Sequence, residues 1–474
     1  MADLTPAPPQ RPFLWPTLVE NLAALLPNPE RVYLVGGVVR DALLRRPIHD
    51  IDLATPDDGL EVARGLADSL GGAYYPVDPE RRTGRVVLGS EGITTDIDVA
   101  SFRGAEGATD NLLADLAGRD FTVNALAVRL DDIESIIDPL EGQRDLFQRR
   151  ALRLCSPTSI ADDPIRVLRA LRHSLKFKLR LIPQTVAALR ASASSLLTAH
   201  GDLRQPERSR DELFKLLQET RPASALRLAH TLSLLHLILP FELAESDLAF
   251  RHVERLDDLL RTISYRRDDN VAADLMLGVA VMVLDRHRQP LNDHFAQQSG
   301  VGRYRQSLAY LAVLAEQSHA SAETWADWLF LSNQERHVLA SLDRSRDIDL
   351  FQVDQVDDRW LYRCYKRAGD GAIDHTLISL ASYLASSAQP SPDRWGKLLD
   401  QIASPIFAAY FDRYDQIVTP QPLLDGHALM ADFGLEPGPI LGEVIDRLKE
   451  EQAAGAISTD REARAWVADW LDHH

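Results

Sequence analysis

Hydrophobic and polar positions in the first 145 residues follow two different periods. RVYLVGG (31–37) is largely apolar, whereas HDIDLAT (49–55) and ITTDIDVASF (93–102) alternate polar and apolar residues, as half-exposed strands do. Between the first two of these segments, VVRDALL has the apolar spacing of a helix. The pattern predicts a compact α/β unit that ends near residue 145.

A further helix is predicted directly after the second strand. We expect Thr55 to cap its start, with Pro56 in the first turn and Asp58 completing a capping box. The pair Gly71–Gly72 should end this helix after Leu70, because glycine accepts the left-handed backbone common at helix ends.

The periodicity changes at about residue 151. Strand-like alternation stops, and segments such as DDPIRVLRALRHSLKF (162–177) and RDELFKLL (210–217) repeat the helical apolar period. Breaks in the helical pattern are expected at four prolines, Pro240, Pro290, Pro390 and Pro420. A small α/β head followed by a long helical remainder is the predicted layout, and 474 residues suggest roughly two to four domains.

The composition is that of a soluble globular protein, with 45% hydrophobic and 26% charged residues. The longest apolar runs, such as LMLGVAVMVL (275–284), have about half the length of a membrane span. MADLTPAPPQRP (1–12) lacks the features of a signal peptide and predicts a short disordered leader. The two cysteines, Cys155 and Cys364, form no CxxC pair, which favours a reducing cytoplasm and argues against structural zinc.

The net charge of −18 is unevenly distributed. Residues 1–240 hold 29 Lys and Arg against 32 Asp and Glu, which leaves −15 for residues 241–474. Residues 144–190 hold 11 basic and 3 acidic residues. An anionic partner is therefore expected to bind locally near the middle of the chain. A solvated helix face is the alternative reading of these arginines, and charge alone favours it.

Two aspartates in the second predicted strand are candidates for chemistry. Asp50 and Asp52 are two residues apart, so both carboxylates should project from the same face of the strand. Adjacent carboxylates repel and need a cation, and Mg²⁺ prefers carboxylate oxygens. Taken alone, the pattern is weak, because exposed strand ends often carry such residues.

The residues before this pair are candidates for phosphate binding. Gly36 and Gly37 permit close approach of the backbone, and the start of the following helix offers free N–H groups. Arg40 could add charge-assisted bonds to the same phosphate. For the glycines alone, a tight strand-to-helix turn is the favoured explanation, but their combination with Arg40 and the two aspartates within residues 36–52 favours a phosphate site.

Asp96 and Asp98 form a second alternating pair in another predicted strand. If the two strands are neighbours, this pair could supply a third carboxylate to a two-metal phosphoryl-transfer site. A solvent-facing polar edge is the alternative, above all for Asp96.

Several segments together resemble the tRNA nucleotidyltransferase and poly(A) polymerase family, in its bacterial class II. The resemblance begins with LVGGVVRDALLRRPIHDIDLAT (34–55). The further matching segments follow in the family's order: GRDFTVNALAV (118–128), IIDPLEGQRDLFQRRALR (136–153), DDPIRVLRALR (162–172), PERSRDELFKLL (206–217) and LLDGHALMADFGLEPGPILGEVIDRL (423–448).

The resemblance implies an α/β nucleotidyltransferase head, with a mixed sheet like that of polymerase β, followed by an all-α neck, body and tail. A leader and first helix would occupy residues 1–29, and the catalytic head residues 30–150. A neck that recognises the base and binds RNA would span 151–245, the body 246–415 and the tail 416–474.

The activity implied by the resemblance is template-independent addition of C, A or both to the tRNA 3′ end. CTP or ATP would be the substrate, pyrophosphate the leaving group, and two Mg²⁺ ions the cofactor. A poly(A) polymerase of the same family and a non-catalytic RNA-binding relative are the alternatives. No membrane or DNA partner is expected, and the expected location is the cytoplasm.

The resemblance also implies roles for individual residues. Asp50 and Asp52 would hold the catalytic metals, and Asp98 matches the third acidic position. The residues expected to contact the triphosphate or ribose are Gly36, Gly37, Arg40, Arg119, Asp120 and Asn124.

Base recognition is assigned to the start of the helix in residues 162–177. Asp163 and Arg166 would serve as a protein template, because acceptors from Asp and donors from Arg complement the mixed edges of cytosine and adenine. Arg169 is expected among the nucleotide-binding residues. The helical stripe formed by Arg166, Arg169, His173 and Lys176 could bind phosphate or simply be solvated.

Three departures from the family pattern bear on the product. Gly118 replaces an arginine, Asp162 replaces a glutamate, and the segment 103–119 is shorter than the family's flexible loop. Because that loop serves the switch from C to A addition, a CC-adding specialist is an open alternative.

The body faintly resembles an HD phosphohydrolase domain in residues 250–260 and 279–288. Leu284 stands where the metal-binding His of the His-Asp pair belongs, which leaves only Asp285. We therefore expect a helical scaffold without metal or hydrolase activity. The histidines His252, His287 and His294 are expected to be structural or exposed.

Overall fold

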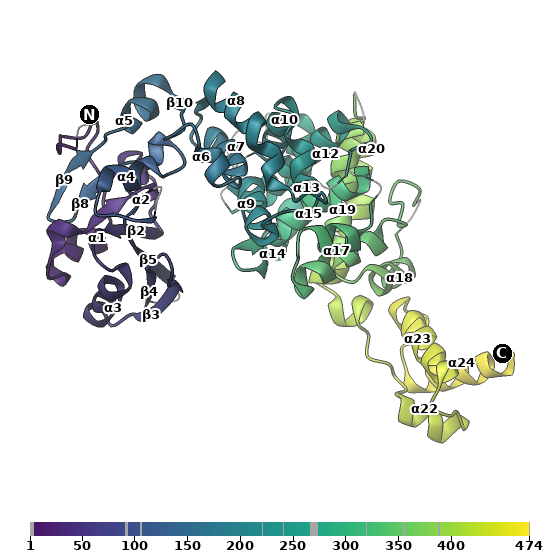
Figure 1. Ribbon diagram of the computed structural model, residues 1–474. Helices are drawn as coiled ribbons and strands as arrows, with labels where there is room; N and C mark the ends of the chain where they lie inside the picture. The colour runs from purple at the N-terminus through teal and green to yellow at the C-terminus, as the bar shows by residue number, and fades with distance from the viewer. Residues whose placement is uncertain are drawn as a thin grey trace. The chain divides into compact units, whose positions relative to one another are not determined.

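The protein is described by a computed structural model that covers residues 4–473 except 91–92, 105–106, 220, 240, 266–273, 319, 354–355 and 387–388. The chain forms two compact units, each with its own packing (Figure 1). The first comprises Met1–Gln205 with Leu232–Leu237, and the second Pro206–Thr231 with Ile238–His474. No described helix combines the length and the apolar character that crossing a bilayer requires.

A seven-stranded mixed sheet organises the first unit, with the order β3-β4-β5-β2-β1-β8-β9. Strands β2 and β5 run parallel, and the pairs on either side of them run antiparallel. The strand bounds are β1 Tyr33–Val35, β2 Asp50–Thr55, β3 Ala73–Asp78, β4 Thr83–Ser90, β5 Ile93–Ser101, β8 Ala127–Arg129 and β9 Asp132–Ile137.

Helices pack against both faces of this sheet. α3 packs against β4 and β5, where Ile97 and Val99 are fully buried. On β2, Ala54 lies on the same face as Asp52 and packs with Leu112 of α4 in a hydrophobic cluster. The bounds are α1 Thr17–Leu22, α2 Gly37–Leu43, α3 Gly59–Leu70, α4 Leu112–Ala117, α5 Gly142–Arg144, α6 Ser159–Asp162, α7 Arg166–Lys176 and α8 Pro183–Ser192.

The start of α3 differs from the sequence prediction, while its end agrees. Thr55 is the last residue of β2, and the N-cap is Asp58, whose side chain accepts a hydrogen bond from Leu60 N at 2.9 Å. The prediction of Thr55 as cap is wrong because β2 continues through Thr55 in register with β5. Gly71, with φ +66°, ends the helix in the left-handed conformation, as predicted.

The sheet edges hold two features that the hydrophobic pattern did not reveal. Strand β3 contains Pro76, which is tolerated because β3 lies at the edge of the sheet. At the opposite edge, Ala7 exchanges backbone hydrogen bonds with Ile136 of β9, and Gln10 N donates to Gln143. The segment 4–12 is thus tied to the head, unlike the disordered leader that its composition predicts.

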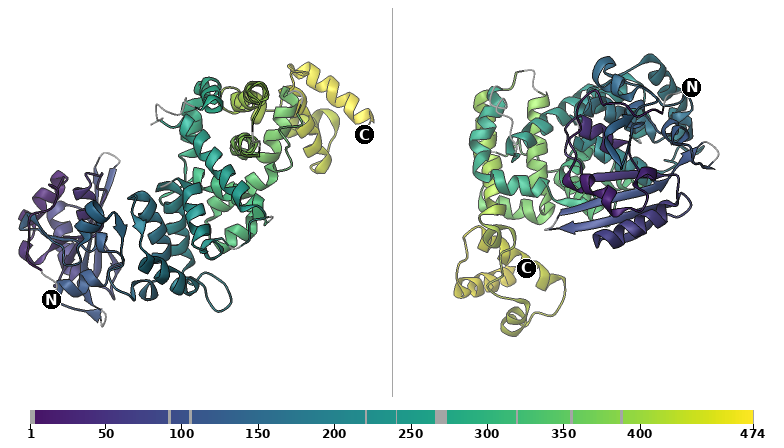
Figure 2. Two further views of the ribbon diagram at one scale, coloured as in Figure 1. Left: turned by 90° about the horizontal axis from the view of Figure 1, so that it is seen from above. Right: turned by 90° about the vertical axis from the view of Figure 1, so that its left-hand side faces the viewer.

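The second unit consists almost entirely of packed helices, drawn from teal to yellow in Figure 2. α12 packs against α10, α15 and α19, and the tail helices enclose a small core of their own. The helix bounds after residue 205 are α9 Pro206–Glu219, α10 Pro222–Thr231, α11 Leu235–Ile238, α12 Ser246–Ile263, α13 Leu275–Leu284, α14 Arg288–Phe295, α15 Arg305–Ser318, α16 Ala322–Trp328, α17 Asn333–Ser345, α18 Asp358–Ala368, α19 Gly371–Ser386, α20 Pro392–Lys397, α21 Ser404–Phe411, α22 Gly426–Phe433, α23 Pro439–Ala453 and α24 Asp460–His473.

The predicted helical remainder has small exceptions. Two short two-stranded sheets, β10 Ala151–Leu152 with β11 Arg180–Leu181 and β12 Gln298–Gly300 with β13 Arg303–Tyr304, interrupt it. Pro290 lies in the first turn of α14, where its missing N–H is tolerated, so the break precedes it. The prediction at Pro240 lies outside the described residues.

Candidate active site

Four carboxylates line one face of the sheet where β2 and β5 run side by side. Asp50 lies opposite Asp96, and Asp52 lies opposite Asp98, in an unbroken parallel register. The two predicted acidic strands are therefore neighbours. Since residues that pair across a ladder share a face, all four side chains project to the same side. Asp50 is exposed, and the other three are half-buried.

The environment of Asp52 disfavours its negative charge. Burial, together with nearby Asp98 and Asp50, raises the pKa of Asp52, although Arg119 and Arg169 act in the opposite direction. Within the described part of the chain, no side-chain hydrogen bond or ion pair reaches Asp50 or Asp52. A carboxylate pair of this kind fits a divalent cation, which would neutralise it and use the oxygens that Mg²⁺ prefers.

Asp98 already has a cationic partner. Arg85 of β4 donates to both carboxylate oxygens of Asp98, at 2.7 and 2.8 Å. Accordingly, the described residues contain no group of three His, Cys, Asp or Glu side chains arranged to ligate one metal ion. The structure thus offers Asp50 and Asp52 as a pair and engages the third carboxylate elsewhere.

The glycine turn after β1 lies close to an arginine. Gly36 has φ +74°, and its N–H donates to the Leu126 carbonyl at 3.1 Å. A Cβ atom at Gly36 would lie 2.8 Å from Nη1 of Arg119. The positive φ favours glycine here, and a side chain at this position would also require the flexible end of Arg119 to shift. α2 begins at Gly37 directly after this turn.

Arg40 is held inside the head rather than pointing outward. Its guanidinium donates to Asn124 Oδ1 and to the carboxylate of Asp41, and it lies 4.1 Å from the ring centroid of Phe177. Only 6% of its surface is exposed. Contact between Arg40 and a triphosphate stays a prediction, and the structure gives it a role in fixing Asn124.

Asp120 connects the predicted nucleotide-binding residues. Its carboxylate accepts hydrogen bonds from Asn124 Nδ2 at 2.9 Å and Arg169 Nε at 2.8 Å. Burial alone would raise the pKa of Asp120, but Arg169, His173 and the bond from Asn124 outweigh burial and lower it well below its usual value. The bonds from Arg169 through Asp120 and Asn124 to Arg40 join α7 to α2, so the structure brings these residues together.

Asp163 and Arg166 occupy the junction between α6 and α7. Arg166 donates to the carbonyl oxygens of Gly118 at 2.9 Å, Arg119 at 3.3 Å and Ser159 at 3.0 Å. It therefore holds the end of α4, and reading of a base by this pair stays a prediction. Asp163 lies in the turn that ends α6.

On the predicted stripe of α7, His173 is packed inside the head, whereas Arg169 and Lys176 stay half-buried. His173 is buried, with its ring 5.5 Å from those of Phe121 and Phe177. Burial and the adjacent Arg172 hold its pKa well below the ordinary value. Both readings offered for this stripe are wrong at His173, because the helix packs against the head.

Comparisons with known proteins agree with this geometry. The Poly A polymerase head domain family matches residues 32–153, and the family described as the probable RNA and SrmB-binding site of polymerase A matches residues 178–244. An A-adding tRNA nucleotidyltransferase of Deinococcus radiodurans is 33% identical over 94% of this chain and 97% of its own length. The chain belongs to the tRNA nucleotidyltransferase and poly(A) polymerase family.

Other members and solved structures extend the comparison. A CC-adding tRNA nucleotidyltransferase of Geobacter sulfurreducens is 29% identical, covering 92% of this chain and 91% of its own. A CCA-adding enzyme in complex with ATP superposes with TM-score 0.66 at 23% identity, and the Thermotoga maritima CCA-adding enzyme complexed with tRNA with TM-score 0.60 at 22%. Each alignment covers 96% of this chain and 95% of the other, which confirms the predicted fold class.

Sequence reasoning missed two residues of this nucleotidyltransferase head. One is Arg85, whose pairing with Asp98 depends on the register of β4. The other is Asp145, which is fully buried and accepts hydrogen bonds from Thr122 Oγ1 at 2.6 Å and Arg149 Nη1 at 2.9 Å. Its position in the family segment 136–153 was the available signal, and its contact with Thr122 braces the turn that carries Asn124.

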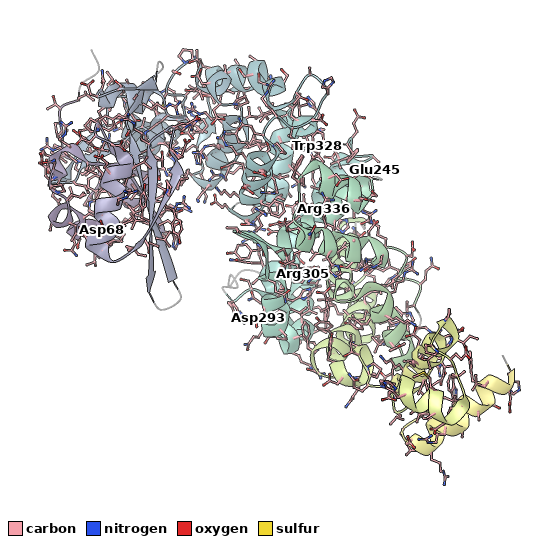
Figure 3. All side chains as sticks on the ribbon, turned by 60° about the horizontal axis from the view of Figure 1, so that its bottom comes forward. Asp68, Glu245, Asp293, Arg305, Trp328 and Arg336 are labelled. Carbon is pink, nitrogen blue, oxygen red and sulfur yellow. The ribbon has the colours of Figure 1, made fainter. Side chains whose placement is uncertain are left out.

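The three histidines singled out in the body have internal partners. His252 shares a hydrogen bond with the Ile378 carbonyl at 2.8 Å, and His287 lies beside the ring of Phe407. His294 Nε2 lies 2.8 Å from Asp374, which Arg305 of α15 (Figure 3) also contacts. These partners give all three histidines structural roles, as predicted.

Proposed function

We propose that this protein is a tRNA nucleotidyltransferase that adds C, A or both to the tRNA 3′ end, with CTP or ATP as donor. The observation that carries the proposal is the acidic face of the head. Asp50 and Asp52 project together beside Asp98, next to the turn where Gly36 meets Arg119. The Deinococcus radiodurans relative, similar over nearly its whole length, supports the same activity.

Asp50 and Asp52 would hold the catalytic Mg²⁺ ions. When bound, the metal would activate the RNA 3′-hydroxyl and stabilise the leaving pyrophosphate. Among the described residues, neither carboxylate accepts a side-chain hydrogen bond or forms an ion pair, so both are free to bind a metal ion.

The residues around the Gly36 turn would bind and orient the nucleotide. Arg119, partly exposed beside Gly36, is placed to contact the triphosphate with its remaining donors. Asn124, held by Asp120 and Arg40, would contact the ribose. Since these partners fix its rotamer, little ordering is needed when the nucleotide binds.

Residues 151–245 would form the neck that selects the base. Asp163 and Arg166 would face the Watson–Crick edge, which requires Arg166 to exchange its bonds to the Gly118 and Arg119 carbonyls for bonds to the base. Residues 246–415 and 416–474 would serve as body and tail. We place the protein in the cytoplasm, where its two cysteines, both unpaired in the structure, would stay reduced.

The segment 103–119 is relevant to which nucleotides the enzyme would add. Between Arg103 and Ala108, β6 (Arg103–Gly104) and β7 (Gly107–Ala108) pair as a short hairpin, and α4 follows at Leu112. This compact connection favours partial addition over complete CCA synthesis by one enzyme. Relatives named as CC-adding and A-adding both align over nearly the whole chain, so either partial activity fits.

The test is a set of primer extensions. Transcribed tRNAs ending before the CCA, after C and after CC are each incubated with one NTP and Mg²⁺. Extension with CTP to CC, with no addition of A to the CC end, identifies a CC-adding enzyme, and addition of A to the CC end alone identifies an A-adding enzyme. Both reactions together identify a CCA-adding enzyme. Long A tails on unrelated RNA would show a poly(A) polymerase. Absence of extension at all three ends would refute the proposed function.

A further inference from the structure

Arg85 is a cation built into the acidic face of the head. It lies opposite Asp98 in the antiparallel register of β4 and β5, so both side chains project to the same side of the sheet. Nε and Nη2 donate to the two oxygens of Asp98 at 2.7 and 2.8 Å. Nη1 lies 3.1 Å from Oδ2 of Asp96. One guanidinium therefore contacts two of the four carboxylates and offsets one of their negative charges.

The fork of the Arg85 guanidinium engages both oxygens of Asp98, the atoms through which Asp98 would bind a metal ion. A bidentate arginine occupies one lone pair on each oxygen of Asp98. Asp98 lies directly opposite Asp52 in the β2–β5 register, so an ion held by Asp52 could use Asp98 only through an oxygen that already accepts a bond from Arg85. The ion and the Arg85 guanidinium would then both contact Asp98, and their positive charges would repel each other.

The ion pair between Arg85 and Asp98 is partly exposed to solvent, so Asp98 could release Arg85 and bind a metal ion instead. The two side chains keep 38% and 29% of their surface exposed, and ion pairs with this exposure contribute little free energy. Arg85 also retains Asp96 as a second partner, to which it could turn after releasing Asp98. The ion pair between Arg85 and Asp98 can therefore break and re-form at low cost in free energy.

We propose that Arg85 is the resident counter-cation of this site, and that a divalent ion must displace it from Asp98 to recruit the third carboxylate. Arg85 thereby weakens metal binding to the free enzyme and partly offsets the negative charge of the acidic face until the ion arrives. Arg85 is a positioning residue, because it acts through Asp98. The inference rests on the metal site proposed at Asp50 and Asp52.

The test measures Mn²⁺ binding to the full-length protein without nucleotide or RNA, by titration calorimetry and by the EPR signal of free Mn²⁺. The variant is Arg85→Met, which keeps the side-chain length and removes the charge. The matched control is Arg81→Met, which removes an exposed arginine that pairs with Asp78 in the turn before β4. Arg85→Lys is a second variant, because it keeps the charge but cannot form the fork.

We expect Arg85→Met to bind Mn²⁺ roughly fivefold more tightly, the factor set by loss of one half-exposed ion pair. Arg85→Lys should lie between Arg85→Met and the wild type, and Arg81→Met should match the wild type. Unchanged or weaker binding to Arg85→Met, or binding detectable in none of these proteins, would overturn the proposal. Weaker binding would mean that Arg85 merely holds Asp98 in place.

A third variant separates this inference from the proposed function. Adding Asp52→Asn to Arg85→Met should abolish the gain in affinity. If the gain persists, the ion binds elsewhere, and both the role of Arg85 and the metal role of Asp52 are wrong. If wild-type binding depends on Asp52 but does not respond to Arg85→Met, only the role of Arg85 fails.

Discussion

Asp52 on β2 and Asp98 on β5 lie opposite each other on parallel strands, although 45 residues and two further strands separate them along the chain. This pairing turns two ordinary alternating strands into one acidic face. It also places the face beside the Gly36 turn, since β1 is the next strand after β2 in the sheet. The pairing of Asp52 with Asp98 therefore positions the acidic face next to the predicted nucleotide-binding turn.

Asp50→Asn should abolish nucleotide addition without unfolding the protein. Asp50 is exposed and has no side-chain partner within the described part of the chain, so its loss costs little stability. Loss of a metal ligand should lower the turnover number by at least about 10²-fold. Incorporation of labelled CMP or AMP, with a circular dichroism melt as the folding check, measures both effects.

The matched control for that variant is Asp96→Asn, on the facing strand. Asp96 lies on the same face but contacts Arg85, so its activity should stay within about tenfold of the wild type. Equal losses in the two variants would contradict a specific role for Asp50.

Asp52→Asn should stabilise the metal-free protein while removing activity. Burial and the neighbouring carboxylates raise the pKa of Asp52, so the fold loses stability as the pH rises from the ordinary carboxyl value to that raised value, and the loss is complete above it. We expect the variant to melt at a higher temperature than the wild type at pH 7 in EDTA. The difference should vanish below about pH 4, where the wild-type carboxyl is protonated in both states. A lower melting temperature at pH 7 would contradict this account.

Gly36→Ala should impair both folding and nucleotide binding. The residue has φ +74°, and the new Cβ would lie 2.8 Å from the Arg119 guanidinium. We expect a loss of about 1–3 kcal/mol in the free energy of unfolding and a raised KM for the nucleotide. Gly65→Ala in α3 is the control, because nothing lies within 4 Å of its added Cβ. That change should leave KM unaltered and stabilise the helix by about 0.5–1 kcal/mol.

Asp120→Asn should destabilise the protein in a pH-dependent way. The pKa of Asp120 lies well below its ordinary value, so the ionised carboxyl contributes stability that is complete above about pH 4 and is lost as the pH falls toward the folded-state pKa. Urea unfolding at pH 7 should show a loss on the order of 2–3 kcal/mol, since Arg169 keeps only a neutral partner.

The pH series provides the diagnostic result for Asp120. The deficit of Asp120→Asn should narrow below about pH 4, because the unfolded wild type takes up a proton there while the folded carboxyl stays ionised to lower pH. Asp131→Asn, which alters an exposed pair with Arg129, should change stability by less than about 1 kcal/mol at any pH. A deficit in Asp120→Asn that is constant down to pH 2 would contradict the charge-based explanation.

The local features of this site follow from the sequence, whereas its long-range contacts do not. A period of two already places Asp50 and Asp52 on one face, and the helix end at Gly71 follows from glycine chemistry. The adjacency of β2 and β5 required the structure, because a strand has no local signal for its partner. The same holds for Arg85, whose role depends on register alone.

Burial explains where the sequence reading of single residues failed. For Arg40, contact with a phosphate stays a prediction, and its burial beside Phe177, far along the chain, had no signal in the sequence. His173 was placed on an exposed stripe because helical spacing gives a face without saying what packs against it. Thr55 and Asp58 are both good caps, and the register of β2 with β5 decided between them.

The most direct test of the central claim is single-nucleotide gel analysis of labelled tRNA ends after incubation with CTP or ATP. The wild type and a variant that combines Asp50→Asn with Asp52→Asn are compared at equal concentration in Mg²⁺. We predict that the wild type extends at least one of the three tRNA ends by one or two nucleotides, and that the variant extends none. Equal extension by both proteins, or none by the folded wild type, would contradict the account.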